Sequence, residues 1–479
     1  MRRLLLIGFL FAGVSLPAAV VRYPAPPGAP RSPDYRVFVD GEEIFTYQAP
    51  VASFAAFDFE GEVAIEIRPA RDVKWVDVRP RSRGVRPRIE QGVIRFSLDR
   101  PANLSIEVNG ELARPLFLFA NPIERDAPKP GDEGVHYFAG GKIYDVGILE
   151  VGSDETVYIA GGAIVRGAIV ADRAERVTIR GRGILDGTST RGRKHPRLRR
   201  TRLINFLECR DVSVSGIILY NSDTWQIVPI LSEQVRISNV KILSGNNSDD
   251  GIDIVRSSDV LVDGVFVRTK DDCVAIKSFL GSGAGGDRGT YRVTVQNSVF
   301  WNAEWGNAME IGFELKTPRV DDIVFRNIDV IHVEDGAVFS IHNGDRATVS
   351  NVLVEDVRIE DARQKLFDIA IFRSQYSDDK PKTEEERRRL YLHGAWDGVI
   401  RVPEDKRDYH ARFRGHIKGV RLRNIRIVDG LFPFSIFCGF DREHRVENVT
   451  IDGLWVHGRR IRRLEDLRCF VHQARIILN

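Results

Sequence analysis

Two pairs of adjacent aspartates lie within residues 248–278, in the stretch SDDGIDIVRSSDVLVDGVFVRTKDDCVAIKS. The first pair is Asp249 and Asp250, and the second is Asp271 and Asp272. Clustered carboxylates can serve as acid and base in glycosidic cleavage, bind a hard cation such as calcium, or face solvent in turns. The residue types alone leave these three possibilities open.

The elements that must position these residues are marked by a short recurring phrase. Each copy alternates apolar and polar residues, as a half-buried strand does, and ends in Gly, Asn or Asp, which tolerate a left-handed backbone. The copies are VTIRG from Val177, VSVSG from Val212, VRISN from Val235, VLVDG from Val260, VTVQN from Val293, IVFRN from Ile323, VLVED from Val352, VRLRN from Val420 and VTIDG from Val449. A strand phrase every twenty to thirty residues predicts stacked parallel coils, that is, a parallel β-helix.

The phrase is missing before about residue 120, where short strands alternate with DG, EG and NG turns. This pattern of short strands and tight turns is typical of an antiparallel β-sandwich. We therefore predict an all-β protein with a sandwich domain over 33–120 and a β-helix catalytic domain over 121–479. An insertion at 357–419 interrupts the repeat, and within it Thr383 and Glu386 form a capping box that predicts a short surface helix.

The spacing of the aspartates matches the length of one coil. Asp250 is 21 residues before Asp271 and 22 before Asp272. Residues one coil apart lie over each other, about 4.8 Å apart at the backbone. Asp250 is therefore expected beside the other pair, and like charges that close raise the pKa of one carboxyl group.

The N-terminal residues 1–19 pair two arginines with a short apolar run, which predicts a cleaved signal peptide and a secreted protein. The formal net charge is +3 and falls to +1 without Arg2 and Arg3. A nearly neutral chain without a second long apolar run gives no reason to expect nucleic-acid or membrane binding. We expect a monomer.

The four cysteines lack the spacing of metal ligands, so neither a metal site nor a cofactor is expected. Cys209 and Cys273 lie in apolar strand contexts, which favours buried free thiols over disulfides.

The motifs DDGID (249–253) and DDCVAIKS (271–278), with GRGILDG (181–187) and NSDTWQIVP (221–229) upstream, resemble the polygalacturonase family of glycoside hydrolases. The resemblance implies a right-handed parallel β-helix and hydrolysis with inversion by three aspartates. Asp271 would be the general acid. Asp250 and Asp272 would hold and deprotonate the attacking water. The leading sandwich resembles the dextranase and isopullulanase group, which implies a neutral glucan as an alternative substrate.

The chain departs from the family pattern at two motifs. Asn307, in WGNAMEIG, stands near the expected histidine of Gly-His-Gly, and VFSIHNG (338–344) lacks the Arg-x-Lys clamp for a substrate carboxylate. Arg319, Arg346 and Arg373 are the nearest arginines that could replace the clamp.

Other polar and aromatic residues near these motifs are the predicted substrate contacts. They are Asn307, Glu310, His342, Trp225 and Trp305, with Glu314 and His332 as further candidates. Each has a plainer interpretation. Asn307 and His342 could occupy turns, Trp225 could belong to the core, and Glu310 should face outward, opposite Met309 and Ile311, and lie exposed.

We therefore predict a secreted hydrolase of a pectin-like polysaccharide, without a cofactor. Three alternatives remain: a hydrolase of a neutral glucan, a β-helix lyase that uses calcium with Lys270 or Lys277 as base, and a non-catalytic glycan-binding β-helix.

Overall fold

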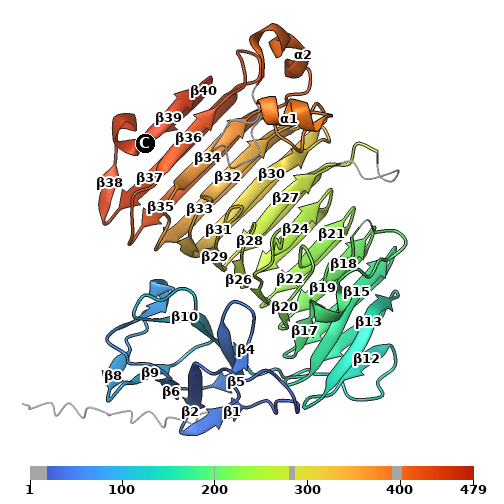
Figure 1. Cartoon of the computed structure of the whole chain (residues 1–479), viewed down its shortest axis with the longest axis vertical. Helices are drawn as coiled ribbons and strands as arrows, with labels where there is room; N and C mark the ends of the chain where they lie inside the picture. Colours follow the sequence, from blue (N-terminus) through green and yellow to red (C-terminus); the bar gives the residue numbers. More distant parts are fainter. Residues whose placement is uncertain (1–18, 199, 280–285, 391–401) are drawn as a thin grey trace, which may run out of the picture.

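The computed structural model describes residues 19–198, 200–279, 286–390 and 402–479. The predicted signal peptide lies outside this part of the chain except for its last residue. Two small sheets precede a long sheet whose strands stack as a solenoid (Figure 1). The predicted fold class, a parallel β-helix after a small sandwich domain, is confirmed.

The sandwich domain contains one six-stranded and one five-stranded sheet with an apolar core between them. The first comprises β1 (Ala19–Val21), β4 (Tyr47–Gln48), β5 (Ser53–Glu60), β7 (Val76–Arg79), β10 (Ala102–Val108) and β11 (Leu116–Pro122). The second comprises β2 (Tyr35–Val39), β3 (Glu42–Ile44), β6 (Val63–Pro69), β8 (Arg88–Glu90) and β9 (Val93–Leu98). All pairings are antiparallel except that of β5 with β11. Since β1 pairs with β5, the sheets begin before the predicted boundary at residue 33.

The solenoid is built from three parallel ladders, and several long strands run through two of them. The first ladder contains β12 (Val135–Phe138), β14 (Thr156–Ile159), β16 (Glu175–Gly181), β19 (Arg210–Ser215), β22 (Glu233–Ser238), β25 (Ser258–Asp263), β28 (Thr290–Gln296), β31 (Arg319–Val333), β33 (Thr348–Ile359), β35 (His416–Ile427), β37 (Val446–Val456) and β40 (Ala474–Leu478). The second contains β13 (Ile143–Val151), β15 (Ile164–Asp172), β17 (Ile184–Asp186), β20 (Ile218–Tyr220), β23 (Lys241–Leu243), β26 (Phe266–Thr269), β29 (Val299–Asn302) and the ends of β31, β33, β35 and β37. The third contains the ends of β13 and β15, then β18 (Ile204–Leu207), β21 (Ile227–Ile230), β24 (Ile252–Val255), β27 (Val274–Ser278), β30 (Met309–Leu315), β32 (Ala337–Asn343), β34 (Lys365–Ile371), β36 (Phe434–Cys438) and β39 (Cys469–His472). A last strand, β38 (Arg459–Ile461), folds back antiparallel onto β37.

The recurring phrase forms the first ladder, in register from its first copy to its last. Val177 pairs with Val212, and the same position then continues through every copy to Val449. The final residue of each copy, from Gly181 to Gly453, has a positive φ. The Gly, Asn and Asp endings therefore mark the corner at which the chain turns toward the second ladder.

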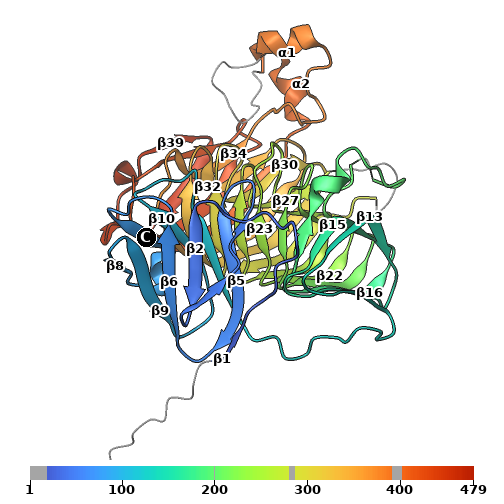
Figure 2. The same ribbon diagram turned by 60° about the horizontal axis from the view of Figure 1, so that its bottom comes forward.

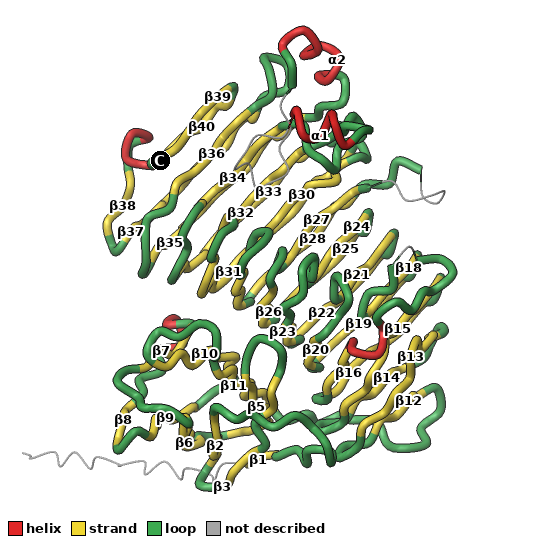
Figure 3. Tube along the Cα trace, in the orientation of Figure 1, coloured by secondary structure: helices red, strands yellow, loops and turns green. Residues whose placement is uncertain are grey.

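Inward-facing Val, Ile, Leu and Phe side chains from all three ladders fill one continuous core. The insertion carries two short helices, α1 (Glu384–Leu390) and α2 (Arg407–Ala411), which lie beyond the ladders toward the C-terminal end (Figure 3). The predicted capping box is present, because the Glu386 amide donates to Thr383 Oγ1 at 3.1 Å and the Thr383 amide to Glu386 Oε2 at 3.3 Å. Short 3-10 turns lie at Arg81–Arg83, Gly187–Thr190, Glu404–Lys406 and Leu464–Leu467. Within the described ranges, no helix is long and apolar enough to cross a membrane.

The sandwich domain packs against the outer face of the second ladder (Figures 1 and 2). Phe117 of β11 lies 4.8 Å from the Phe266 ring and 5.8 Å from the Trp301 ring, centroid to centroid. Ion pairs border this apolar contact. Arg79 Nη1 lies 2.7 Å from Glu360 Oε2 across the two domains. The second ladder is therefore closed to ligands where the sandwich covers it, whereas the third ladder is not covered in this way.

Candidate active site

The third ladder aligns the aspartates on successive coils. Ile252 pairs with Val274 and Val274 with Met309, so Asp250, Asp272 and Asn307 occupy the same position, two residues before the paired residue. The backbone bonds agree, since the Gly251 amide donates to the Asp272 carbonyl and the Cys273 amide to the Asn307 carbonyl. One register position thus brings three of the predicted site residues into a column.

Trp225 extends this column by one more coil, because Ile227 pairs with Ile252. Its half-buried indole lies beneath the ammonium group of Lys277, with Nζ 4.3 Å from the ring centroid. The half-buried Trp305 comes just before Asn307, and its amide donates to the Lys270 carbonyl at 2.6 Å. Both tryptophans therefore border the carboxylates.

The three predicted catalytic carboxylates converge. Asp250, Asp271 and Asp272 each contribute one oxygen, and these oxygens lie within 4.8 Å of one another. Asp250 and Asp272 are buried, whereas Asp271 is partly exposed. Asp271 is thus the least buried residue of the trio.

Gly306 makes room for this convergence. Its φ is +66°, and a Cβ at this position would lie 2.4 Å from Asp271 Oδ1 and 2.6 Å from Asp272 Oδ1. Both distances are far below van der Waals contact. Glycine is required here by the left-handed backbone and by the close approach of the two carboxylates.

The buried cation Lys277 is a site residue that sequence reasoning did not identify as a carboxylate partner. Its Nζ lies 3.1 Å from Asp250 Oδ2, 3.2 Å from Asp253 Oδ1 and 3.9 Å from Glu314 Oε2. Lys277 and Asp253 each follow an inward Ile and therefore face outward. The alternation of inward and outward residues could therefore have identified Lys277 and Asp253 from the sequence, once DDGID and DDCVAIKS had been assigned to paired strands.

Burial and mutual repulsion set the proton affinity of the trio. Burial, and next the charge of Asp250, raises the pKa of Asp271 to about 8. The same two causes, joined by Asp271, raise the pKa of Asp272 well above its ordinary value. Burial lowers the pKa of Lys277, but attraction to Asp250 and Asp253 outweighs it, so the pKa is raised and the ammonium stays charged.

Asn307, Glu310 and His342 lie behind the carboxylates, Asn307 in the loop between β29 and β30 and the other two on strands. The Asn307 amide donates to Asp272 Oδ1 at 2.7 Å. Glu310 faces away from the core as predicted, but it is fully buried, contrary to the expectation of exposure, because neighbouring polar residues cover it. His342 is also buried, in the middle of β32, with Nδ1 3.1 Å from Glu310 Oε2.

His332 does not belong to this site. It lies on the outer side of the solenoid that meets the sandwich, where its Nε2 is 3.0 Å from Glu107 Oε1 and its Nδ1 is 3.0 Å from Asp361 Oδ2. The prediction that grouped it with His342 was wrong, because the two histidines are on different ladders, β31 and β32.

The arginines considered as a replacement clamp have other partners. Arg319 pairs with Asp321, and Arg346 with Asp378. Arg373 donates from Nε and Nη2 to the Asp379 carbonyl.

The three carboxylate oxygens are close enough together to hold a cation, but the site does not suit calcium well. Calcium takes six to eight oxygen ligands in most proteins. Here three carboxylates each offer one oxygen, and the Lys277 ammonium already pairs with Asp250. A buried positive charge at this position would repel a divalent ion.

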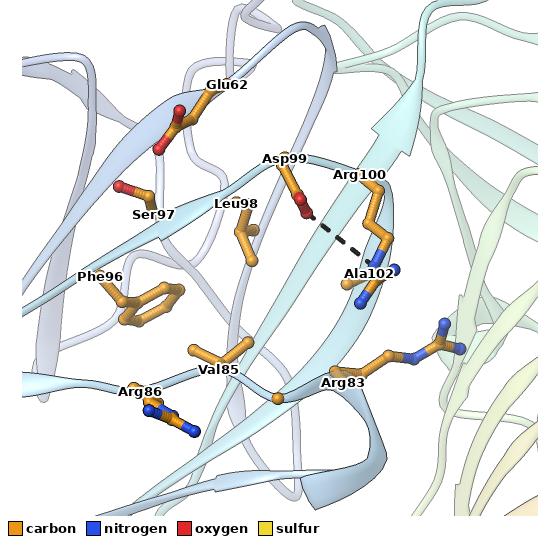
Figure 4. Close-up of a pocket in the computed structure, with 11 residues that line it drawn as sticks. Glu62, Arg83, Val85, Arg86, Phe96, Ser97, Leu98, Asp99, Arg100 and Ala102 are labelled. Atoms are coloured by element: carbon orange, nitrogen blue, oxygen red, sulfur yellow. Dashed lines mark ion pairs between the residues drawn. The ribbon is translucent and has the colours of Figure 1, made fainter.

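A hollow of about 400 Å³ lies elsewhere, in the sandwich domain (Figure 4). It is lined by charged residues such as Arg83, Arg100, Glu62 and Asp99 together with Phe96. None of the predicted site residues borders it, so it contributes nothing to the chemistry of the carboxylates.

Comparisons with known proteins find similarity in the solenoid. Residues 150–387 match the family model of glycosyl hydrolases family 28. Endopolygalacturonase A of Aspergillus niger is 29% identical over 180 residues, which cover 32% of this chain and 48% of that protein. Probable rhamnogalacturonase A of Aspergillus oryzae is 27% identical over 176 residues, 36% of this chain and 34% of that protein. These matches bear out the predicted resemblance to the polygalacturonases.

The chain spans about half of the length of the endopolygalacturonases it matches, and the similarity lies in the solenoid. The whole architecture is similar to that of Dex49A from Penicillium minioluteum, with a TM-score of 0.61, 15% identity and coverage of 93% of this chain and 92% of that one. At this identity the likeness concerns the fold, and its coverage of this chain extends over more than the solenoid.

Proposed function

We propose that this protein hydrolyses the glycosidic bonds of a polysaccharide at Asp250, Asp271 and Asp272. The observation that carries the proposal is the convergence of their oxygens within 4.8 Å beside the buried Lys277 ammonium. Three carboxylates crowded in this way cannot all ionise easily, so the site holds both a proton donor and proton acceptors near neutral pH.

Asp271 is the general acid in this proposal. Its pKa, raised to about 8 by burial and by Asp250, keeps the carboxyl group protonated at neutral pH. It is also partly exposed, so it can meet the glycosidic oxygen of a bound sugar. Donation of this proton to the leaving oxygen is the step that a glycosidic bond requires.

Asp250 and Asp272 hold the attacking water. Hydrogen bonds between oxygens are about 2.7–2.8 Å long, so one water can bridge two oxygens that are up to about 5.5 Å apart. The measured separation, within 4.8 Å, meets this condition. Lys277 fixes Asp250 and Asn307 fixes Asp272. When Asp271 holds the proton, its charge no longer raises the pKa of Asp272, so the remaining oxygens of Asp250 and Asp272 can accept the protons of the water.

Inversion is the stereochemical outcome we propose, following the resemblance. The carboxylates are closer together than the roughly 6.5–9.5 Å typical of an inverting pair of acids. With three carboxylates, however, the water need not lie between the acid and a single base, because Asp250 and Asp272 bind it jointly beside Asp271.

The substrate we propose is a pectin-like polysaccharide whose acid groups are esterified, or a neutral glycan. Near the expected Arg-x-Lys clamp, β32 presents the buried Ser340, which donates to Glu310, and the buried His342, whose Nδ1 lies 3.1 Å from Glu310 Oε2. An ionised uronate bound among aspartates without its own cation would be penalised by about 1–3 kcal/mol per subsite. This is about a tenfold to hundredfold loss of affinity.

A panel of glycans tests the proposal. Purified protein is incubated with polygalacturonate, its methyl ester, rhamnogalacturonan and dextran at equal concentrations, and release of reducing sugar is measured. We expect hydrolysis of at least one substrate, with plain polygalacturonate not the fastest. Ultraviolet absorbance from an unsaturated product would indicate a lyase instead, and binding without any product would indicate a glycan-binding protein.

Export belongs to the same proposal, since a polysaccharide substrate lies outside the cell. N-terminal sequencing of the protein recovered from culture medium should begin close to Ala19 or Val20. Recovery of the full N-terminus from the cytoplasm would contradict it. A monomer stays a prediction, which light scattering would check.

A further inference from the structure

A buried polar chain extends from the candidate active site along the third ladder. Glu310, Ser340 and Asp368 are register partners on β30, β32 and β34. Asn307 Nδ2 lies 3.1 Å from Glu310 Oε2, and the imidazole of His342 bridges Glu310 and Asp368 at 3.1 and 3.2 Å. All five residues are at most 3% exposed. They lie beneath the site and cannot contact a substrate.

The orientation of the Asn307 side chain is fixed by its surroundings. Its Oδ1 accepts the backbone amide of Ala337 at 2.9 Å. The Nδ2 group must therefore point the other way, toward Glu310 Oε2 and toward Asp272 Oδ1 at 3.4 Å. A rotated amide would direct an oxygen at two carboxylates, which is unfavourable.

His342 is a cation in this environment. Nδ1 lies 3.1 Å from Glu310 Oε2 and Nε2 lies 3.2 Å from Asp368 Oδ2, so the two nearest charged groups are carboxylates, although neither contact has hydrogen-bond geometry. Burial lowers the pKa of His342, but the charges of Glu310 and Asp368 outweigh burial and raise it well above its ordinary value. The Phe313 ring stacks on the imidazole at 4.7 Å, and Phe372 packs edge-on at 5.5 Å, which holds the ring in place.

We propose that Glu310, His342 and Asp368 are positioning residues that hold Asn307 against the catalytic carboxylate Asp272. Glu310 anchors the Asn307 amide, and the imidazolium of His342 neutralises Glu310. Without that neutralisation, the Glu310 charge would add to the repulsion that Asp272 already receives from Asp250 and Asp271. This row of buried polar side chains thus links the charge of His342 to the position of the Asp272 carboxyl group and to its pKa.

The same protein contains a matched control. His332 is also buried between two carboxylates, Glu107 and Asp361, but it lies at the contact with the sandwich domain. His332→Gln and His342→Gln therefore remove the same buried cation from similar surroundings. Both should lower the melting temperature, whereas only His342→Gln should affect Asp272.

The kinetic test uses a glycan that the wild type hydrolyses, so this part rests on the proposed function. His342→Gln should reduce kcat by about 10- to 100-fold, the contribution of a hydrogen bond to a charged group, with little change in KM. The acidic limb of its pH profile should move to higher pH, because Asp272 binds its proton more tightly. The double variant Glu310→Gln/His342→Gln should recover part of the rate, since the glutamine that replaces Glu310 can still accept from Asn307 without carrying a charge.

A second measurement does not depend on activity. NMR of protein with ¹⁵N-labelled histidine should show an imidazole signal that stays doubly protonated at pH 8, is lost in His342→Gln and is kept in His332→Gln. A neutral His342 at pH 7 would overturn the inference. So would equal pH profiles for wild type, His332→Gln and His342→Gln. If the wild type cleaves no glycan, the proposed function fails. The NMR result still tests the inference in that case, because it shows whether His342 carries the positive charge that neutralises Glu310.

Discussion

The outer faces of the second and third ladders differ in the side chains that they carry on the same scaffold. The second ladder presents a largely apolar surface, including Phe266 and Trp301, which the sandwich domain covers. The third presents Lys277, which pairs with Asp250 and Asp253, and Glu310, which accepts from Asn307. The inward residues of both ladders belong to one apolar core. Outward residues therefore decide whether a ladder docks a domain or carries out chemistry.

The two buried histidines show the same difference at the level of single residues. His332 joins an ionic cluster with Glu107 and Asp361 that links the sandwich to the solenoid. His342 makes similar contacts with Glu310 and Asp368, but Glu310 also holds Asn307. The two histidine clusters contain similar groups but should have different roles, because the His332 cluster borders the domain contact and the His342 cluster borders three carboxylates.

The largest effect is expected from Asp271→Asn, which should reduce turnover at the site on the third ladder. Loss of a general acid costs about 100- to 10,000-fold in turnover. The fold should remain intact, because the substitution replaces a carboxyl group that is protonated near neutral pH and changes little in volume. Turnover on the best glycan and the melting temperature are measured on the same preparation. Full activity in a variant that melts normally would remove Asp271 from the mechanism.

Phe117→Ala, at the contact between the sandwich domain and the second ladder, should have the opposite effect: stability should fall and activity should not change. Loss of a buried phenylalanine costs about 3–5 kcal/mol of stability. Because Phe117 packs on Phe266 and Trp301, we expect a lower denaturation midpoint, with kcat per folded molecule unchanged. A changed kcat at a temperature where the variant is folded would show that the sandwich contact influences the site.

Gly306→Ala should damage the site by displacing Asp271 and Asp272. A misplacement of about 1 Å can cost about 100-fold in rate. Gly264→Ala is the matched control, since Gly264 has a φ of +67° and open space around its Cα. Both variants introduce similar backbone strain, but only the Gly306→Ala side chain meets the two carboxylates, so only Gly306→Ala should lose activity. Equal kinetics for the two variants would show that the close contact at residue 306 is unimportant.

The smallest effect is a pH dependence of stability. The pKa of Asp271 is raised from 3.8 to about 8 in the folded protein, so the folded state binds this proton more tightly than the unfolded state. The stabilisation from Asp271 is complete below about pH 4 and is lost as the pH rises through about 8. The melting temperature of the wild type should therefore fall more between pH 5 and pH 8 than that of Asp271→Asn. An equal fall in both proteins would contradict the raised pKa.

The sequence predicted the solenoid well because its first ladder has a local signature. Each phrase from Val177 to Val449 combines strand alternation with a residue that tolerates positive φ, and both features act within five residues. The spacing of Asp250 and Asp271 then followed from the coil length. These parts of the structure depend on short-range rules and on a repeat that can be counted.

The partners of the carboxylates could not be predicted in the same way. Glu310 was expected to be exposed, because alternation gives the direction of a side chain and not what covers it. It is buried by Asn307, Ser340 and His342, which come from segments of irregular spacing. The contact of His332 with Glu107 is a further example, since it joins residues 225 positions apart in the chain. Such contacts depend on the packing between coils and domains.

The stereochemistry of cleavage tests the central claim most directly. The glycan that is hydrolysed fastest is digested with a high concentration of enzyme, and ¹H NMR records the anomer of the product before mutarotation. Joint activation of a water by Asp250 and Asp272, with Asp271 as acid, predicts that the first product has the anomeric configuration opposite to that of the substrate. A product that retains the configuration of the substrate would contradict the account, because one aspartate would then attack the sugar itself.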